Sequence, residues 1–301
     1  EQRPALREIL RPEPARAYGE ILVAVGGASF DTHPVTMASE SALGQPSMAP
    51  RAAPILLRGG AWERGFAPLP YTGVEAHGIA DLCAEVFGGE QPARVLDGRV
   101  ASAAAIEELG PRARWLHIAT HGWFAPESVR SWSDPSPLDV KDGFLTRMST
   151  EEQIIGASPM LLCGLALAGA NLPADELGRF PGLLTAEELA AWDLSNCELA
   201  VLSACDTNVG IRRAGQGVAS LQEALHMAGA RTVITSLLKV PDEATQKLML
   251  DFYRRLWVEK KPKWQALWEA KMRLRDEKGE RGEPKYSTRD WAAWVITGDP
   301  D

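Results

Sequence analysis

The stretch LAVLSACDTNVGIRRAGQG, residues 199–217, joins an apolar run to a cysteine and a polar, glycine-rich segment. The run predicts a buried strand ending at Ser203 or Ala204, because serial apolar residues followed by turn-forming residues are typical of a strand covered on both faces. Cys205 follows directly. In an open α/β sheet the carboxyl ends of the strands border the ligand-binding crevice, so this position favours a reactive thiol. A core cysteine is the alternative, since most cysteines are packing residues.

A second predicted strand end supplies an imidazole. The run RWLHIAT, Arg114 to Thr120, has the same apolar character and is followed by His121 and Gly122. A cysteine nucleophile needs a nearby base, because the thiolate is the reactive form and a free thiol has a pKa of about 8.5. An imidazolium also stabilises the thiolate and can later protonate the leaving amine. His121 is therefore the candidate base and Cys205 the candidate nucleophile.

The remaining pattern predicts an α/β fold. Short apolar runs predict further strands, and apolar residues three and four apart predict the helices between them. The other expected strands are Ile21–Val25, Arg94–Leu96, Arg231–Leu237 and Trp291–Ile296. The expected helices are Val74–Phe87, Ser102–Leu109, Thr185–Trp192, Gln216–Met227 and two more after Pro241. Strands separated by helices of this length indicate a mostly parallel, doubly wound sheet with helices on both faces.

The other cysteines are interpreted as structural. Cys163 is the rival nucleophile, but it lies inside the apolar run 160–170, where side chains face the core. Cys83 belongs to a predicted helix together with His77, and both are interpreted as structural or surface residues. Cysteines without a CxxC pair fit a reducing compartment better than a disulfide framework or a zinc site.

No metal or cofactor is expected. His117 and His121 cannot share an ion, because four residues of a strand span roughly 13 Å. His117 is expected to pack against a neighbouring element, with a supporting role beside the site as the alternative. GGASFD, residues 26–31, lacks the GxGxxG pattern of a dinucleotide-binding loop. A nucleotide- or flavin-binding domain is therefore a weaker alternative, as is a serine hydrolase, for which no GxSxG elbow is present.

Length, charge and hydropathy limit the function classes. The chain has 301 residues, 45% of them hydrophobic, a net charge of −8 and a pI near 5.3. This acidity argues against nucleic acid or an anionic membrane as partner, because either needs a basic surface. The longest apolar run is too short to span a bilayer. The cysteine pattern, which fits a reducing compartment, leads us to expect a cytoplasmic protein.

The domain organisation is expected to be simple. Residues 1–20 are charged and proline-spaced and are expected to form a linker, whereas residues 21–301 are expected to form one domain. The first residue is Glu1 rather than Met, and no apolar signal sequence follows it. We expect a part of a longer protein, with an activating domain or subunit upstream of the N-terminus.

Six blocks of sequence carry a family resemblance. In order they are LHIATHGWF, GLALAGAN, LLTAEELAAWDL, ELAVLSACDT, GQGVASLQEALHMAGARTVITSL and WAAWVITGD. Together they resemble the CHAT domain of the caspase-like cysteine peptidases, from about Ile21 to Gly298. The resemblance implies a caspase-like sandwich with a six-stranded central sheet, His121 as general base and Cys205 as nucleophile. It assigns the oxyanion hole to the backbone amides of Gly122 and Cys205, and it implies no cofactor.

The same resemblance suggests where substrate binds. In related peptidases the pocket draws on residues after the first strand and on the position two before the nucleophile, which here is Ser203. Relatives that cut after Arg or Lys often carry an acid at that second position, so Asp31 or Asp206 is the candidate carboxylate in its place. Leu238 stands at the rim of the site where the family often has Trp. We expect these residues to contact substrate.

The resemblance implies a cysteine endopeptidase that cleaves a peptide bond in one or a few partner proteins. By analogy with the family, we expect it to be regulated and to act in a bacterial defence or cell-death system. A catalytically silent scaffold that binds a partner protein is the alternative. The dibasic pair Arg212-Arg213 suits self-processing, and a solvated charge pair is the competing interpretation.

Overall fold

The computed structural model describes residues 20–35, 65–89, 92–124, 159–176, 180–204 and 221–301. At its centre lies a six-stranded sheet in the order β2-β1-β3-β7-β8-β9, parallel throughout except for the pair β8–β9. The strands are β1 (Glu20–Ala28), β2 (Ala93–Gly98), β3 (Ala113–Ala119), β7 (Leu199–Ser203), β8 (Thr232–Ser236) and β9 (Trp294–Gly298). The predicted fold class, an α/β protein with a mostly parallel six-stranded sheet, is confirmed.

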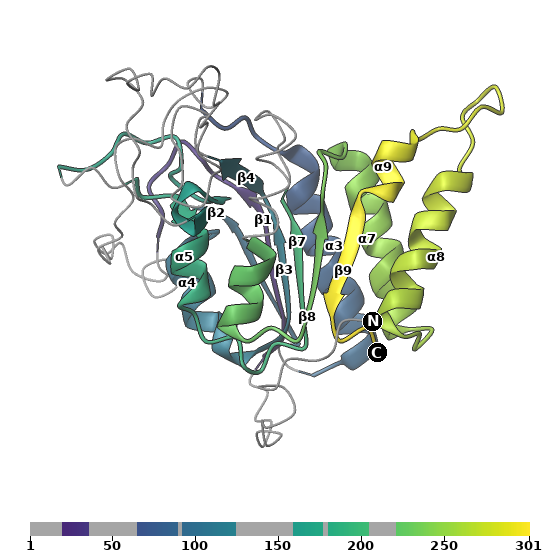
Figure 1. Cartoon of the computed structure of the whole chain (residues 1–301), viewed down its shortest axis with the longest axis horizontal. Helices are drawn as coiled ribbons and strands as arrows, with labels where there is room; N and C mark the ends of the chain where they lie inside the picture. The colour runs from purple at the N-terminus through teal and green to yellow at the C-terminus, as the bar shows by residue number, and fades with distance from the viewer. Residues whose placement is uncertain (1–19, 36–64, 90–91, 125–158, 177–179, 205–220) are drawn as a thin grey trace, which may run out of the picture.

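Helices cover both faces of this sheet (Figure 1). One face carries α3 (Pro70–Phe87), α7 (Asp242–Trp257) and α8 (Lys263–Asp276). The other face carries α4 (Ala103–Leu109), α5 (Ala186–Ala190) and the helical residues 221–228. Alternate residues of β1 enter the two cores, Leu22 and Ala24 on the α3 side and Val23 and Val25 on the α4 side. Burial on both faces explains why these strands are continuous apolar runs in the sequence.

A second, three-stranded antiparallel sheet was not expected from the sequence. It contains β4 (His121–Phe124), β5 (Cys163–Ala166) and β6 (Leu183–Thr185). Thr120 separates it from β3: its N–H donates to the Ser203 carbonyl at 3.2 Å, and its hydroxyl donates to the Ala166 carbonyl. Thr120 thereby holds the corner at which the chain leaves the central sheet. His121 consequently begins a strand of its own.

Two helices begin at side-chain caps, at the residues where the sequence predicts that they start. Ser102 accepts a hydrogen bond from the Ala105 N–H at 3.2 Å, and Thr185 forms a reciprocal capping box with Glu188. Such caps satisfy backbone donors that the first helical turn leaves unpaired. They fix where α4 and α5 begin.

The predicted start of the last strand at Trp291 is wrong. Residues Thr288–Ala292 form α9, and β9 begins only at Trp294. The sequence WAAW has no clear period, and a capping box between Ser287 and Asp290 favours the helix. The last strand is therefore shorter at its amino end than its apolar residues suggested.

The glycine pair after the first predicted strand serves packing. A Cβ on Gly26 would lie 2.1 Å from the carbonyl oxygen of Thr72, so only glycine fits there. The Gly27 N–H donates to the Thr72 hydroxyl at 3.0 Å. The first turn of α3 therefore occupies the space against this pair.

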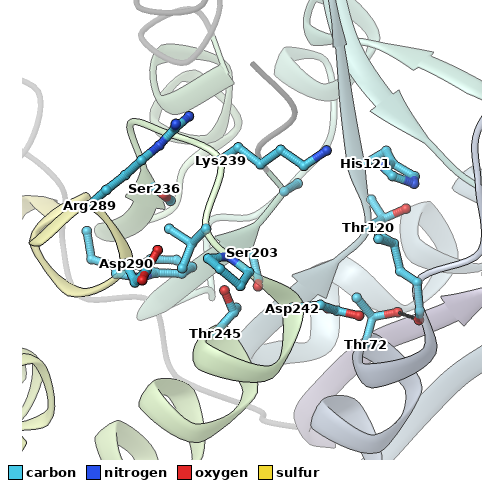
Figure 2. A pocket seen from close by; sticks show the side chains of 15 residues that line it. Thr72, Thr120, His121, Ser203, Ser236, Lys239, Asp242, Thr245, Arg289 and Asp290 are labelled. Carbon is cyan, nitrogen blue, oxygen red and sulfur yellow. Dashed lines mark hydrogen bonds between the residues drawn. The ribbon is translucent and has the colours of Figure 1, made fainter. Parts of the chain in front are cut away.

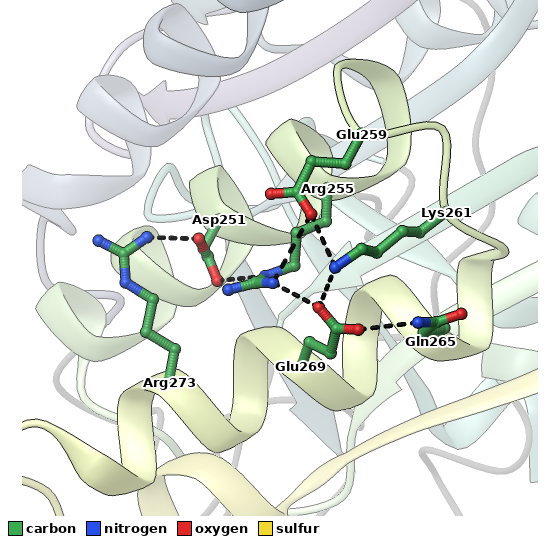
Figure 3. Close-up of polar contacts among 7 residues, drawn as sticks. All are labelled: Asp251, Arg255, Glu259, Lys261, Gln265, Glu269 and Arg273. Atoms are coloured by element: carbon green, nitrogen blue, oxygen red, sulfur yellow. Dashed lines mark hydrogen bonds and ion pairs between the residues drawn. The ribbon is translucent and has the colours of Figure 1, made fainter.

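A network of charged side chains joins α7 to α8 and to the residues between them (Figure 3). Asp251 accepts hydrogen bonds from Arg255 and Arg273, and Glu269 accepts from Arg255 and Lys261. The hydrogen bond from Lys261 is the main reason why the pKa of Glu269 falls to about 2. Isolated exposed pairs stabilise a fold little, but charges that share partners in a network do more.

Candidate active site

A cavity of about 350 Å³ lies at the carboxyl ends of β3, β7 and β8 (Figure 2). This is the edge of the sheet at which a ligand-binding crevice is expected. The residues at the strand ends that line it are Thr120, His121, Ser203, Ala204 and Ser236. The first turns of α3 and α7, α9 and the start of β9 complete the wall. The structure thus places the candidate base and the end of the predicted nucleophile strand around one cavity.

His121 is held by a backbone carbonyl. Its side chain is 7% exposed, and Nε2 lies 2.7 Å from the Ala67 carbonyl oxygen. A carbonyl oxygen can only accept, so Nε2 donates its proton in this contact. In the neutral imidazole the other nitrogen, Nδ1, is then the basic one. The hydrogen bond to Ala67 therefore favours the tautomer in which Nδ1 is the proton acceptor.

Two aromatic rings fix the plane of the imidazole. The ring centroids of Phe30 and Phe66 lie 5.4 Å and 5.6 Å from that of His121, and 5.9 Å from each other. Tilted ring pairs at these separations are favourable contacts. The His121 ring is consequently fixed by packing as well as by its hydrogen bond.

Asn171 anchors the segment that carries Ala67. Its side-chain oxygen accepts from the Phe66 N–H at 2.7 Å, and its amide nitrogen donates to the Phe66 carbonyl at 3.0 Å. The same amide donates to the Asp31 carboxylate at 2.8 Å. Asp31 is therefore tied to the support of His121, and it does not line the cavity.

Gly122 lies against the end of β7. A Cβ at this position would be 3.2 Å from the Ala204 carbonyl oxygen, which is tighter than most real contacts of that atom. Glycine therefore lets β4 approach the strand that leads to Cys205. The sequence pointed to Gly122 because it follows the base; the structure adds the close approach.

These positions agree with a family assignment. The family model of the CHAT domain matches residues 3–299 of the chain. The chain belongs to the CHAT domain family. The match extends over both sheets and over the cavity, and it confirms the resemblance to the CHAT domain that the six sequence blocks carry.

Among solved structures, this CHAT domain is similar to the Arg-specific cysteine proteinase gingipain R (RGPB), with 11% sequence identity and a TM-score of 0.43. That alignment covers 93% of this chain and 46% of the proteinase, so the chain spans about half of its length. The search of curated proteins returned no match to this CHAT domain.

The other predicted site residues fall into three groups. Ser203 lines the cavity. Leu238 is 37% exposed and lies beside the cavity without lining it, and its carbonyl accepts from the Ser236 hydroxyl. Cys205, Asp206, Arg212 and Arg213 lie outside the described residues, so their assigned roles stay predictions.

The three described cysteines are buried and not in disulfides. Burial raises the pKa of Cys83 to about 12, and it does the same for Cys197. Cys163, the rival nucleophile, is 1% exposed on β5. The thiols of Cys83 and Cys197 therefore stay protonated at neutral pH, and all three cysteines are buried, as their apolar sequence context suggested.

His117 has a different environment from His121. Its Nε2 lies 2.8 Å from Oε1 of Glu75, and its Nδ1 lies 3.3 Å from the Tyr253 hydroxyl. All three side chains are fully buried between β3, α3 and α7. The interpretation of His117 as a packed strand residue is confirmed, and its side chain does not line the cavity.

Sequence reasoning missed the residues that α7 brings to the cavity. Asp242 and Thr245 line it from the first turn of this helix, and Lys239 lines it from the segment before. Oδ2 of Asp242 accepts from the Tyr71 N–H at 2.9 Å, and burial raises the pKa of its carboxyl group. The only sequence signal was the expected helix start after Pro241, which does not reveal what the helix faces.

Two features are absent from the described part of the chain. None of the helices there is long and apolar enough to cross a bilayer. Nor do three His, Cys, Asp or Glu side chains gather in those ranges where they could hold a metal ion.

Proposed function

We propose that this CHAT domain is a cysteine endopeptidase with Cys205 as nucleophile and His121 as general base. The main support is the environment of His121, whose Nε2–H is held by the Ala67 carbonyl at the carboxyl end of the sheet. Cys205 is joined directly to Ala204, which lines the same cavity as His121. Membership of the CHAT domain family supports the same assignment, because the sequence blocks of that family resemble those of caspase-like cysteine peptidases.

The proposed reaction follows from these roles. Nδ1 of His121 takes the thiol proton, and the resulting imidazolium stabilises the thiolate of Cys205. The thiolate attacks the carbonyl carbon of the scissile bond, and the backbone amides of Gly122 and Cys205 bind the oxyanion. The imidazolium then donates its proton to the leaving amine, and water hydrolyses the thioester. The loss of one oxyanion donor typically lowers the reaction rate by about 10²–10³, so these two amides make a large contribution to the proposed catalysis.

The proposal also covers the substrate, the activator and the cellular role. We propose a specific partner protein as substrate, an activating domain or subunit upstream of the N-terminus, and a cytoplasmic role in bacterial defence or cell death. The net charge of −8 supports a protein rather than a nucleic acid as partner. Expression of the active chain and of Cys205→Ala in a bacterial host, followed by mass spectrometry of new protein N-termini, tests this. A substrate gives new termini only with the active chain.

The dyad itself is tested without a substrate. Limiting iodoacetamide is applied to the native chain between pH 5 and 9, and the labelled cysteines are identified by peptide mass spectrometry. We expect Cys205 to react rapidly below pH 7, while Cys83 and Cys197 stay unlabelled because their pKa values are about 12. In His121→Ala the Cys205 rate at pH 6 should fall by about a hundredfold or more, since an ordinary thiol has a pKa of about 8.5.

A matched control is His77→Ala. His77 is exposed and paired with Asp97 at 2.8 Å, away from the cavity. This variant should leave the Cys205 rate unchanged. If Cys205 reacts no faster than an ordinary thiol in the native chain, the proposed peptidase is replaced by the silent scaffold.

A further inference from the structure

The cavity beside His121 contains a carboxylate that the proposed reaction does not use. Asp242 lines the cavity, and its Oδ2 accepts the Tyr71 N–H at 2.9 Å. Within the described ranges, Oδ1 has no hydrogen-bond partner. A carboxylate offers about four acceptor sites, so most of the accepting capacity of Asp242 is unused.

Burial makes this shortage costly. Desolvation raises the pKa of Asp242, and this effect exceeds the opposing ones of the Tyr71 N–H and of His121. Asp242 is half-buried, and a charge withdrawn from water is stable only when it is paired and hydrogen-bonded. Among its described neighbours only His121 lowers this pKa through its charge, so Asp242 lacks a strong cationic partner there.

The rest of the lining suits a long side chain with a cationic end. Ser203 and Thr245 also line the cavity, and neither hydroxyl has a hydrogen-bond partner among the described residues. Both hydroxyl oxygens can accept from an ammonium or a guanidinium, which only donate. Leu69, Val240 and Trp294 supply apolar wall for an aliphatic stem.

The other charges of the cavity are already engaged. Oδ2 of Asp290 accepts from the N–H and the hydroxyl of Ser287 and thereby caps α9. Lys239 and Arg289 each have an interaction of their own within the protein. In Figure 2 the side chain of Lys239 extends toward the His121 side, and the guanidinium of Arg289 points away from Asp242.

We propose that this cavity receives a lysine or arginine side chain of the protein substrate, with Asp242 as the residue that binds its charge. The side chain is the one that precedes the scissile bond. This inference rests on the proposed peptidase function, because a pocket beside His121 selects the cleavage site only if His121 acts on a bound peptide. Ser203 and Thr245 accept the remaining N–H groups of the cation.

The test compares two ligands of the same shape. Peptidyl chloromethyl ketones with arginine or its uncharged isostere citrulline at the position before the ketone alkylate the native chain, and intact mass gives the rates. The Cys205 sulfur displaces chloride from the methylene carbon, so one C–S bond replaces one C–Cl bond. We expect arginine to react about ten to a hundred times faster than citrulline, the range for a hydrogen bond to a charged group.

The variant Asp242→Asn keeps the shape of the side chain and an oxygen for the Tyr71 N–H. It should reduce the ratio of arginine to citrulline rates to within about twofold. Glu243→Gln removes the same charge from the same turn, but Glu243 faces Lys247 and Lys285 and does not line the cavity. This control should keep the full ratio. Equal rates for the arginine and citrulline ketones in the native chain would overturn the assignment, as would an unchanged ratio in Asp242→Asn. A third chloromethyl ketone with glutamate at the same position should react more slowly than the arginine one, and the opposite order would also overturn it.

Failure of the peptidase proposal is detected separately. The variant Cys205→Ala cannot react, so binding of acetyl-arginine amide and acetyl-citrulline amide is measured on it by saturation-transfer NMR. Preferred binding of the arginine ligand, lost in Cys205→Ala/Asp242→Asn, supports the pocket even if iodoacetamide shows no activated thiol. Absence of any preference overturns it, whatever the reactivity of Cys205.

Discussion

His117 and His121 lie four residues apart on one stretch of chain and have opposite environments. His117 is fully buried under β3, and both of its nitrogens lie within hydrogen-bonding distance of side chains, Glu75 and Tyr253. His121 lines a cavity, and its Nε2 is held by the main-chain carbonyl of Ala67. In both rings an oxygen accepts the Nε2–H.

The difference between the two acceptors decides what each ring can do. The Glu75 carboxylate and the Tyr253 hydroxyl both contact the buried His117 ring, so the three side chains connect α3 and α7 to β3. A carbonyl acceptor orients His121 without placing a charge on it, and the ring borders a space large enough for a substrate side chain. One histidine is therefore part of the buried core, and the other lines the cavity in which the proposed proton transfer would take place. Four predictions test this difference between His117 and His121.

The largest expected effect is on folding. His117→Ala should lower the free energy of unfolding by about 3–5 kcal/mol, because it leaves the Glu75 carboxylate buried without its partner. His121→Ala should cost far less, since no buried charge loses its partner. Chemical denaturation measures both. The double variant Glu75→Leu/His117→Leu should recover most of the loss, and a small loss in His117→Ala would mean that Glu75 does not need the pair.

The next effect concerns the support of His121. Asn171→Ala should slow Cys205 labelling at pH 6 by about ten- to a hundredfold. A displacement of a catalytic group by about 1 Å can lower the rate by up to about a hundredfold. Asn196→Ala is the matched control, since Asn196 donates to the Pro111 carbonyl at 2.8 Å far along the chain from this support. Equal rates in the two variants would show that Asn171 does not position the Ala67 carbonyl.

A smaller effect is expected at the phenol beside His117. Tyr253→Phe removes one buried hydroxyl and should lower the free energy of unfolding by about 0.5–1.5 kcal/mol. The pH dependence of Cys205 labelling should stay the same, because His117 takes no part in the proposed reaction. A shift in that labelling profile would contradict the separation of the two histidines.

The smallest effect concerns Asp242, the acid beside the His121 cavity. The pKa of Asp242 is raised in the folded chain, so the folded state takes up a proton at a higher pH than the unfolded state does. Wild-type stability relative to Asp242→Asn should therefore rise as the pH falls through this raised pKa. Denaturation of both proteins between pH 7 and 4 measures the difference. A relative loss of wild-type stability in this range would reverse the sign.

The sequence predicts the strands of the central sheet and the helix starts better than it predicts the site. The apolar runs of β3, β7 and β8 are strands because they are buried on both faces, and the caps at Ser102 and Thr185 are local signals that survive in the fold. The second sheet was missed because its strands are short and its pairing joins distant segments. Such pairing leaves no periodic pattern in a single strand.

The site shows the same limit. His121 and Gly122 could be chosen from their position after a strand, but the Ala67 carbonyl is a main-chain atom that every residue possesses. Asp31 was expected in the substrate pocket, and the structure ties it to Asn171 instead. Asp242 reaches the cavity only because α7 packs across α3, a contact between residues far apart in the chain.

The helix α7 touches both histidine environments, with Asp242 in its first turn and Tyr253 near its end. Its outer side is joined to α8 through Asp251 and Arg255. The consequence is cooperativity: the cavity wall and the buried Glu75–His117 pair belong to one unfolding unit, since neither can open without displacing the same helix. Amide protons along the centre of α7 should accordingly exchange only through global unfolding, at rates that report the stability of the whole domain.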